Sequence, residues 1–187
     1  MATYATTAIV LRQTDFREAS QLFHFYTREY GKVEAVARGS KKIKSKLRGH
    51  LEPFGIVRIL VAHGKRIDQL AGAAIQDGFQ NIARNLEKIG VASFGIELVD
   101  RLTKPGSPDP EIFDLLADFL ATLDQENLTR AKINAYQDAF ALKLLGLLGL
   151  HPEPRIAKNS AKLRDFLREQ LDREVKSLQF ISSLTIN

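Results

Sequence analysis

The sequence predicts an α+β chain in which a small five-stranded β-barrel is followed by α-helices. Up to about residue 76, apolar residues form short runs or alternate with polar ones, and turn residues separate these segments, as is typical of strands. Beyond that point apolar residues recur every three or four positions, which is the helical period. We therefore expect a barrel domain over residues 1–78 and a helical domain over residues 79–187.

The strands follow from local patterns. A continuous apolar run predicts the first, an aromatic and β-branched run the second, and the alternation of Val33, Ala35 and Ala37 with their neighbours the third. Gly31 is free to take the positive φ of a hairpin turn. The expected strands cover residues 8–11, 21–27, 33–37, 54–62 and 67–75. Five short strands joined by tight turns favour a barrel over an open sheet.

The helices follow from the change of period. A first long helix is expected over residues 81–103, and Pro105 lies in the segment that ends it. Asp109 as N-cap and Pro110 at the first helical position predict the start of the next helix. Further helices are expected over 129–148, 160–171 and 174–184. The buried stripe expected on the first helix is Ile82, Leu86, Ile89, Phe94, Leu98 and Leu102.

Charge is unevenly distributed along the chain. The formal net charge is +5. Residues 31–70 hold ten Lys and Arg against three Asp and Glu, a net charge of +7, whereas residues 77–126 hold four against ten, a net charge of −6. Segregation of this kind indicates one surface suited to a polyanion and another with a different task.

The strongest functional signal is a basic loop at residues 38–48, between the third and fourth expected strands. It holds six cations and no carboxylate. Lys and Arg in such a loop can bind phosphates and displace the counterions condensed on nucleic acid. The alternative is a solvated loop that contributes only to solubility. The predicted phosphate-binding residues are Arg38, Lys41, Lys42, Lys44, Lys46 and Arg48, and Lys32, Lys65 and Arg66 are expected to extend the patch.

Other classes of site lack their motifs. The chain has no cysteine, so thiolate zinc sites and cysteine nucleophiles are excluded, and its four histidines show no metal-ligand spacing. No P-loop or nucleophile elbow is present. We therefore expect no enzymatic activity, no cofactor and no metal. The N-terminus lacks the features of a signal peptide, and no apolar run is long enough for a membrane span, so no membrane association is expected.

Several segments, in family order over nearly the whole chain, resemble RecO, the bacterial recombination mediator. They occupy residues 8–11, 15–18, 25–32, 35–40, 51–54, 97–102, 109–116, 140–152 and 176–180. The resemblance implies an N-terminal oligonucleotide-binding (OB) barrel and a C-terminal helical domain. Many family members also carry a four-cysteine zinc module after the segment that matches residues 149–152. This chain has no cysteine there, so zinc is not expected.

The resemblance also implies a function. It implies binding to single- and double-stranded DNA, annealing of complementary strands, and help in loading the recombinase onto strands coated by single-strand-binding protein. The implied partners are RecR and the acidic C-terminal tail of single-strand-binding protein, and the implied location is the cytoplasm, with the nucleoid. The alternative from another class is a protein-interaction adaptor whose barrel binds a partner and whose basic loop has no direct role with DNA.

Overall fold

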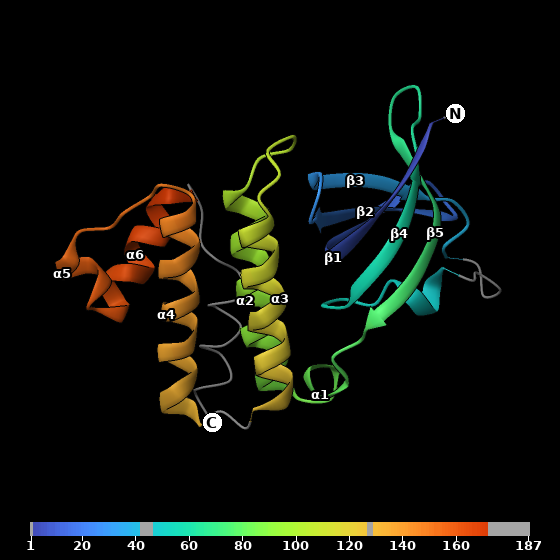
Figure 1. Cartoon of the computed structure of the whole chain (residues 1–187). Coiled ribbons are helices and arrows are strands. Elements are labelled where there is room, and N and C mark those ends of the chain that lie inside the picture. Colours follow the sequence, from blue (N-terminus) through green and yellow to red (C-terminus); the bar gives the residue numbers. More distant parts are fainter. Residues whose placement is uncertain (1, 42–46, 127–128, 172–187) are drawn as a thin grey trace. The chain divides into compact units, whose positions relative to one another are not determined.

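The computed structural model describes residues 2–41, 47–126 and 129–171. In this part of the chain five strands come first and helices follow (Figure 1). The strands are β1 (Thr3–Phe16), β2 (Ser20–Thr27), β3 (Gly31–Ala37), β4 (Ile56–Ala62) and β5 (Asp68–Asp77), with a 3-10 helix, η1 (Arg48–His50), between β3 and β4. Gly31 has a φ of +63°, as the expected hairpin turn requires.

The five strands close into a barrel in the order β1-β2-β3-β5-β4, and β4 returns to pair with β1. All pairs are antiparallel except β3 with β5, which run parallel through Ala35 opposite Asp68 and Val36 opposite Gln69. β1 can close the barrel because it is long. Ala8 at its centre faces Thr27 of β2 on one side and Val57 of β4 on the other.

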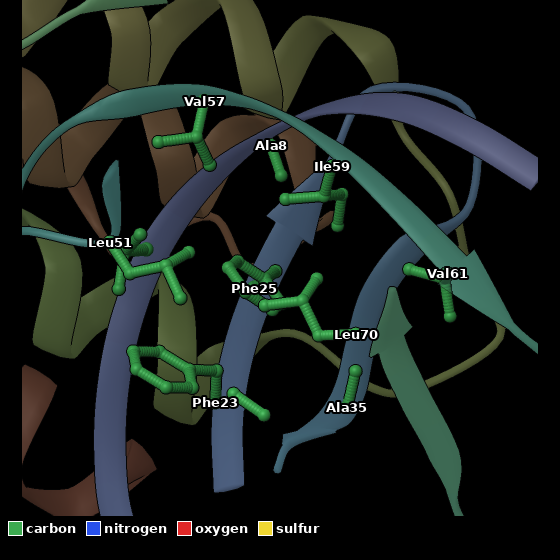
Figure 2. Close-up of a cluster of buried hydrophobic side chains, with 11 residues drawn as sticks. Ala8, Phe23, Phe25, Ala35, Leu51, Val57, Ile59, Val61 and Leu70 are labelled. Carbon is green, nitrogen blue, oxygen red and sulfur yellow. The ribbon is translucent and has the colours of Figure 1, made fainter. Parts of the chain in front are cut away.

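Apolar side chains from all five strands fill the barrel (Figure 2). Phe23 and Phe25 of β2 are the largest of them, and their stacked rings have centroids 5.9 Å apart. Residues two apart on a strand face the same side of a sheet, which explains why these two share the interior. The remaining core residues are Ala8, Val10, Ala35, Ala37, Leu51, Val57, Ile59, Val61 and Leu70. The prediction of a five-stranded OB-type barrel followed by helices is confirmed.

Six helices follow the barrel in the described residues. They are α1 (Gln80–Ala83), α2 (Leu86–Leu102), α3 (Pro110–Gln125), α4 (Arg130–Leu147), α5 (Pro154–Ala157) and α6 (Ser160–Gln170). Asp109 accepts hydrogen bonds from the backbone N–H groups of Glu111 (2.9 Å) and Ile112 (3.4 Å), so it caps α3 as predicted. None of the described helices is both long and apolar enough to cross a membrane. The helix expected at 174–184 lies outside the described residues.

Two local expectations were wrong. The helix predicted over 81–103 is broken at Arg84 and Asn85, because the side chain of Asn85 accepts a hydrogen bond from the N–H of Lys88 (3.1 Å) and starts α2 afresh. The break changes the phase of the helix, and Leu86, assigned to the buried stripe, is 53% exposed. Phe54, expected to start a strand, has a φ of +70°, so β4 begins only at Ile56.

The chain forms two compact units. The first, which we call the barrel unit, contains Met1–Gly78 together with Lys104–Phe113, and the second, the helical unit, contains Phe79–Thr103 and Asp114–Asn187. The barrel unit thus includes a short segment that follows α2 in sequence. Pro105 in this segment bridges to Gly31 and Lys32 at the start of β3.

Asp124, near the C-terminal end of α3, is hydrogen-bonded to residues of α1 and α2 within the helical unit. Its carboxylate accepts hydrogen bonds from the N–H of buried Ile82 (2.9 Å) and from the side-chain amide of Asn81 (3.2 Å). Its carbonyl accepts one from the ammonium group of Lys88 (2.8 Å), which is 9% exposed. α3 has no basic residue in its last turn, so Lys88 of α2 supplies the positive charge that a helix C-terminus favours.

We expect Asp124→Ala to lower the free energy of unfolding by about 1–2 kcal/mol, because it leaves the N–H of Ile82 with only its longer bond to the carbonyl of Phe79 (3.1 Å) and removes the acceptor of the Asn81 amide. Urea denaturation followed by circular dichroism measures the change. Asp165→Ala is the matched control, because that carboxylate only pairs with Arg168 on an exposed face, and its removal changes stability by at most about 0.5 kcal/mol. Equal effects of the two variants would contradict this role of Asp124.

Candidate nucleic-acid interface

The basic loop, residues 38–48, leaves the barrel at the end of β3, and its first residues are fixed there. Arg38 is exposed, and Gly39 turns the chain with a φ of +70°. Ser40 is buried and its hydroxyl donates to the side-chain oxygen of Gln21 on β2 (3.1 Å). The N–H of Lys41 donates to the carbonyl of Ala19 (3.4 Å). The start of the loop therefore lies beside the turn between β1 and β2.

Lys41 has a carboxylate partner. Its ammonium nitrogen lies 2.8 Å from Oδ1 of Asp15 on β1, and the two side chains are 33% and 75% exposed. Exposed pairs of this kind contribute about 0–1 kcal/mol, so a phosphate can compete for the ammonium group at little cost. Sequence reasoning did not connect these residues, because they are 26 positions apart and meet only when β1 and β3 flank β2 in the barrel.

The rest of the predicted patch divides into two sets. Lys42, Lys44 and Lys46 lie outside the described residues, as does the side chain of Arg48. Their contribution therefore rests on the sequence, in which no carboxylate interrupts the loop.

The second set of cations lies elsewhere on the barrel. Lys65 and Arg66 are exposed in the turn between β4 and β5, and Lys32 is half-buried near the start of β3. Arg38 follows the other end of β3, and six residues of extended chain place it about 20 Å from Lys32. β5 begins beside the middle of β3, so the turn at residues 63–67 and the basic loop leave the barrel at different positions along that strand.

The outward face of β2 is covered in this structure. His24 and Tyr26 point away from the barrel core, yet both are buried. Tyr26 donates a hydrogen bond from its hydroxyl to the carbonyl of Asp109 (3.4 Å) in the segment that joins the barrel unit. Burial, and then the negative charge of Asp109, raises the pKa of Tyr26 to about 12. Bases cannot stack on Tyr26 while this segment is in place.

One group of aromatic residues does reach the surface of the barrel unit. Tyr30, in the turn between β2 and β3, is 44% exposed and packs against Tyr4 of β1, which in turn packs against His63. The sequence patterns single out neither Tyr30 nor Tyr4. The signal that could have found Tyr4 is the strand register, because Tyr4 pairs with Val61, two residues before His63.

Two hollows lie among the described residues of the helical unit. The first, of about 250 Å³, is lined by Asn85, Glu87, Lys88, Val91, Leu123, Thr129 and Ile133. The second, of about 160 Å³, is lined by Leu115, Asp118, Phe119, Thr122, Tyr136, Ala139, Phe140 and Lys143. Neither lining contains His, Ser or Cys. Among the described residues, no three His, Asp or Glu side chains are grouped as metal ligands.

Comparison with known protein families gives evidence of ancestry, which the geometry of the structure alone does not provide. Two family models match the chain: one described as Recombination protein O N terminal over residues 1–79, and one described as Recombination protein O C terminal over residues 83–155. The first therefore covers the five strands of the barrel, and the second covers α2, α3 and α4.

Curated relatives agree with these matches. The chain is 37% identical over 155 residues to the DNA repair protein RecO of Pelotomaculum thermopropionicum, which is 81% of this chain and 57% of that protein. It is 38% identical over 125 residues to the DNA repair protein RecO of Geobacter metallireducens, which is 67% of this chain and 51% of that protein. The chain thus spans just over half the length of these relatives.

Proposed function

Because the chain belongs to the RecO family of DNA repair and recombination proteins, we propose that it is a non-enzymatic recombination mediator. In this proposal it binds single- and double-stranded DNA, anneals complementary strands and helps to load the recombinase onto protein-coated single strands. The family assignment supports a role in repair and recombination. The more specific activities are inferred from it together with the charge distribution.

The observation that carries the proposal is the position of the basic loop on the barrel. Its first residues are hydrogen-bonded to β2 and to the β1–β2 turn, so the loop begins at a fixed point on the barrel. The proposed DNA-binding residues are Arg38, Lys41, Lys42, Lys44, Lys46, Arg48, Lys32, Lys65 and Arg66. Six phosphate contacts from the loop correspond to a salt slope of roughly −4 for single strands, at about −0.7 per phosphate.

Annealing follows from the same charge. Two complementary strands repel each other through their phosphates, and cations on one protein surface neutralise part of that repulsion. Two strands bound along one surface can then approach closely enough to pair. No bond is made or broken in this step, so it needs no catalytic residue.

The proposed protein partners are RecR and the acidic C-terminal tail of single-strand-binding protein, and the proposed location is the cytoplasm, at the nucleoid. We further propose that residues 1–78 form the nucleic-acid-binding domain and residues 79–187 the helical domain. The barrel unit also includes Lys104–Phe113, so DNA binding is measured on the whole chain.

Simultaneous charge reversal of Lys41, Lys42 and Lys44 to Glu tests the proposal. We expect the variant to bind a labelled single-stranded oligonucleotide about tenfold more weakly at 0.1 M salt, or weaker still. We also expect its salt slope to be smaller by about 2, because three phosphate contacts are lost. Fluorescence anisotropy at several salt concentrations measures both quantities.

The matched control is reversal of Arg155, Lys158 and Lys162, three exposed cations of the helical unit, which changes the net charge by the same amount. Equal losses in the two variants would mean that net charge alone matters and that the loop is not the site. If the unaltered protein fails to bind DNA at low salt, the mediator proposal is wrong and the adaptor alternative takes its place.

A further inference from the structure

Three aromatic rings meet on the barrel unit although they come from three separate segments. The ring centroids of Tyr4 and Tyr30 are 4.4 Å apart with planes at 48°, and those of Tyr4 and His63 are 5.2 Å apart with planes at 39°. Tyr4 lies on β1, Tyr30 in the β2–β3 turn and His63 just after β4. We call these three residues the aromatic cluster.

The aromatic cluster is open to solvent. Tyr30 is 44% exposed, the side chain of His63 is 56% exposed, and Tyr4 is half-buried between them. By contrast, Phe23 and Phe25 are buried in the core and Tyr26 lies beneath the segment at 104–113. A contiguous exposed aromatic surface on a soluble domain is more informative than a single exposed ring, because such surfaces mark binding sites.

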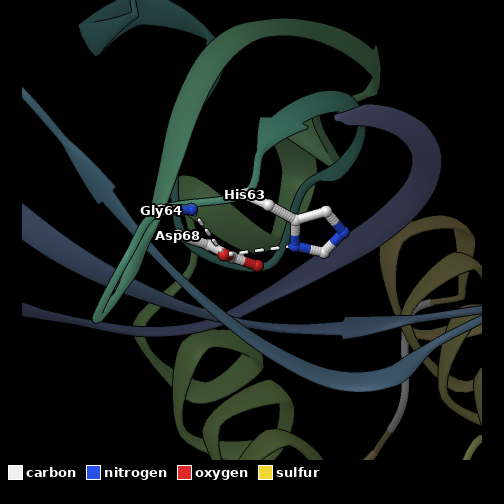
Figure 3. A network of polar contacts seen from close by, with 3 residues as sticks. All are labelled: His63, Gly64 and Asp68. Atoms are coloured by element: carbon white, nitrogen blue, oxygen red, sulfur yellow. Dashed lines mark hydrogen bonds and ion pairs between the residues drawn. The ribbon is translucent and has the colours of Figure 1, made fainter. Parts of the chain in front are cut away.

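Hydrogen bonds hold the aromatic cluster in place. Nδ1 of His63 lies 3.3 Å from Oδ1 of Asp68, and the same oxygen accepts the N–H of Gly64 at 3.1 Å (Figure 3). The N–H of His63 donates to the carbonyl of Ala2 (3.0 Å). A Cβ at Gly64 would lie 1.9 Å from the carbonyl oxygen of Ile67, so this turn can be so tight only with glycine.

The other side of the aromatic cluster is fixed in a similar way. The N–H of Tyr30 donates to the hydroxyl oxygen of buried Thr27 (3.1 Å), and that hydroxyl donates to the carbonyl of Gly31 (2.9 Å). The rings are thus presented by two braced turns and one strand. Little conformational entropy remains to be lost when a flat ligand binds.

The charges around the aromatic cluster suit a nucleic-acid backbone. Lys65 and Arg66 are exposed in the same turn as His63. The carboxylates of these turns are engaged, since Asp68 bonds to His63 and Gly64, and Glu29 accepts a hydrogen bond from the hydroxyl of Thr6. Both carboxylates are therefore held within the protein by hydrogen bonds and do not pair with Lys65 or Arg66 in any contact that the structure describes.

We propose that Tyr4, Tyr30 and His63 form a stacking site for unpaired bases of a single strand whose phosphates contact Lys65 and Arg66. This proposal rests on the proposed DNA binding. It adds to the affinity for DNA a contribution that depends on the bases and not only on the phosphates. Every base has a π-face that can stack on an aromatic side chain, so the site tolerates any sequence. In a duplex these faces are already stacked on neighbouring bases, so the site favours single strands.

The test compares two single-stranded ligands with the same number of phosphates: an oligothymidylate and an abasic oligonucleotide. We expect the unaltered protein to bind the first on the order of tenfold more tightly, in line with stacking of one or two bases. In Tyr30→Ala/His63→Ala this preference is expected to disappear, while affinity for the abasic ligand and the salt slope stay the same. Tyr30→Phe keeps a ring and should keep the preference.

Leu60→Ala is the matched control, because Leu60 is exposed to a similar extent on β4 (40%) but is not aromatic. Thermal unfolding shows whether each variant is folded, and Tyr30→Ala alone, which should reduce the preference, is used if the double alanine variant is not folded. An unchanged preference in a folded Tyr30→Ala or double alanine variant overturns the stacking site while the basic loop stands. If binding to purified RecR is lost instead and DNA binding is unchanged, the aromatic cluster is a protein contact and the proposal is wrong. Absence of any DNA binding by the unaltered protein refutes the proposed function itself.

Discussion

Replacing Phe119 by alanine is expected to destabilise the helical unit by about 3–5 kcal/mol, the usual range for removing a buried phenyl ring. Phe119 on α3 is 4% exposed. Its ring stacks on Tyr136 with centroids 4.8 Å apart and planes at 10°, and its centroid lies 4.3 Å from that of Phe140. The hydroxyl of Tyr136 donates to the carbonyl of Phe119 (2.7 Å). The ring therefore has neighbours that cannot collapse into the space it leaves.

Gly95 of α2 makes room for this ring. A Cβ at position 95 would lie 2.5 Å from Cε1 and 2.8 Å from Cδ1 of Phe119. Because Tyr136 and Phe140 also pack against the ring, it cannot move away freely. We expect Gly95→Ala to destabilise by about 1–3 kcal/mol through overpacking, although alanine is the better helix former.

Two further variants test whether Gly95 and Phe119 compete for space, and urea unfolding measures the stability of each. Gly146→Ala is the same change inside a helix, but nothing lies within 4 Å of the added Cβ, so it should stabilise by up to about 1 kcal/mol. Gly95→Ala combined with Phe119→Leu should be less destabilising than the sum of the two single changes, because the smaller side chain relieves the clash. Additive effects in the double variant would show that Gly95 and Phe119 do not compete for the same space.

Replacing Gly31 by alanine is expected to lower the free energy of unfolding by about 2–4 kcal/mol, for two reasons. The φ of +63° is strained for alanine. In addition, a Cβ there would lie 2.9 Å from both Cα of Pro108 and the carbonyl oxygen of Ser107. These are backbone atoms, so relief requires that the segment 104–113 move. Gly106→Ala is the control, since its φ is +74° but its Cβ would meet nothing within 4 Å.

Tyr26 reports whether that segment has moved, because burial raises its pKa to about 12 and Asp109 adds to the shift. In Gly31→Ala we expect this pKa to fall towards 10, whereas in Gly106→Ala it should stay near 12. Absorbance titration of the phenolate, with Tyr26→Phe subtracted, measures it. An unchanged Tyr26 pKa in Gly31→Ala would show that the segment adapts without leaving β2.

The raised pKa of Tyr26 makes the folded protein less stable as the pH rises above 10. The folded-state pKa of Tyr26 exceeds its unfolded value near 10, so the unfolded state releases this proton first as pH rises. The contribution to stability is complete below pH 10 and is lost between pH 10 and 12. Over that range the free energy of unfolding should fall with a smaller slope in Tyr26→Phe than in the unaltered protein. Denaturation at several pH values checks this.

Most secondary structure was predictable because it follows from local patterns. The period-two pattern placed the strands, and the shift to helical spacing near residue 76 placed the helices. Asp109 and Pro110 marked the start of α3 correctly, since a cap acts within its own first turn. The errors arose where one residue overrides the pattern. Asn85 restarts a helix within an apolar stripe, and Phe54 adopts a positive φ in a segment that looks like a strand.

The candidate site was only partly predictable. The charge of the basic loop is visible in the sequence because its cations are consecutive or nearly so. The pairing of Lys41 with Asp15 and the meeting of Tyr4, Tyr30 and His63 are not, since each joins residues far apart in the chain. Composition likewise cannot tell that Phe23, Phe25 and Tyr26 are buried while Tyr30 is exposed.

By itself, the sequence determined the barrel-then-helix order, the helix cap at Asp109, the basic loop and the resemblance to RecO, because each depends on residues close together or on their order. The tertiary structure alone decided which strands pair, that Lys104–Phe113 joins the barrel and covers Tyr26, and which rings reach the surface. These features depend on contacts between distant segments. Such contacts form only when the strands pair and the barrel closes, because folding then brings segments that are far apart in the sequence side by side.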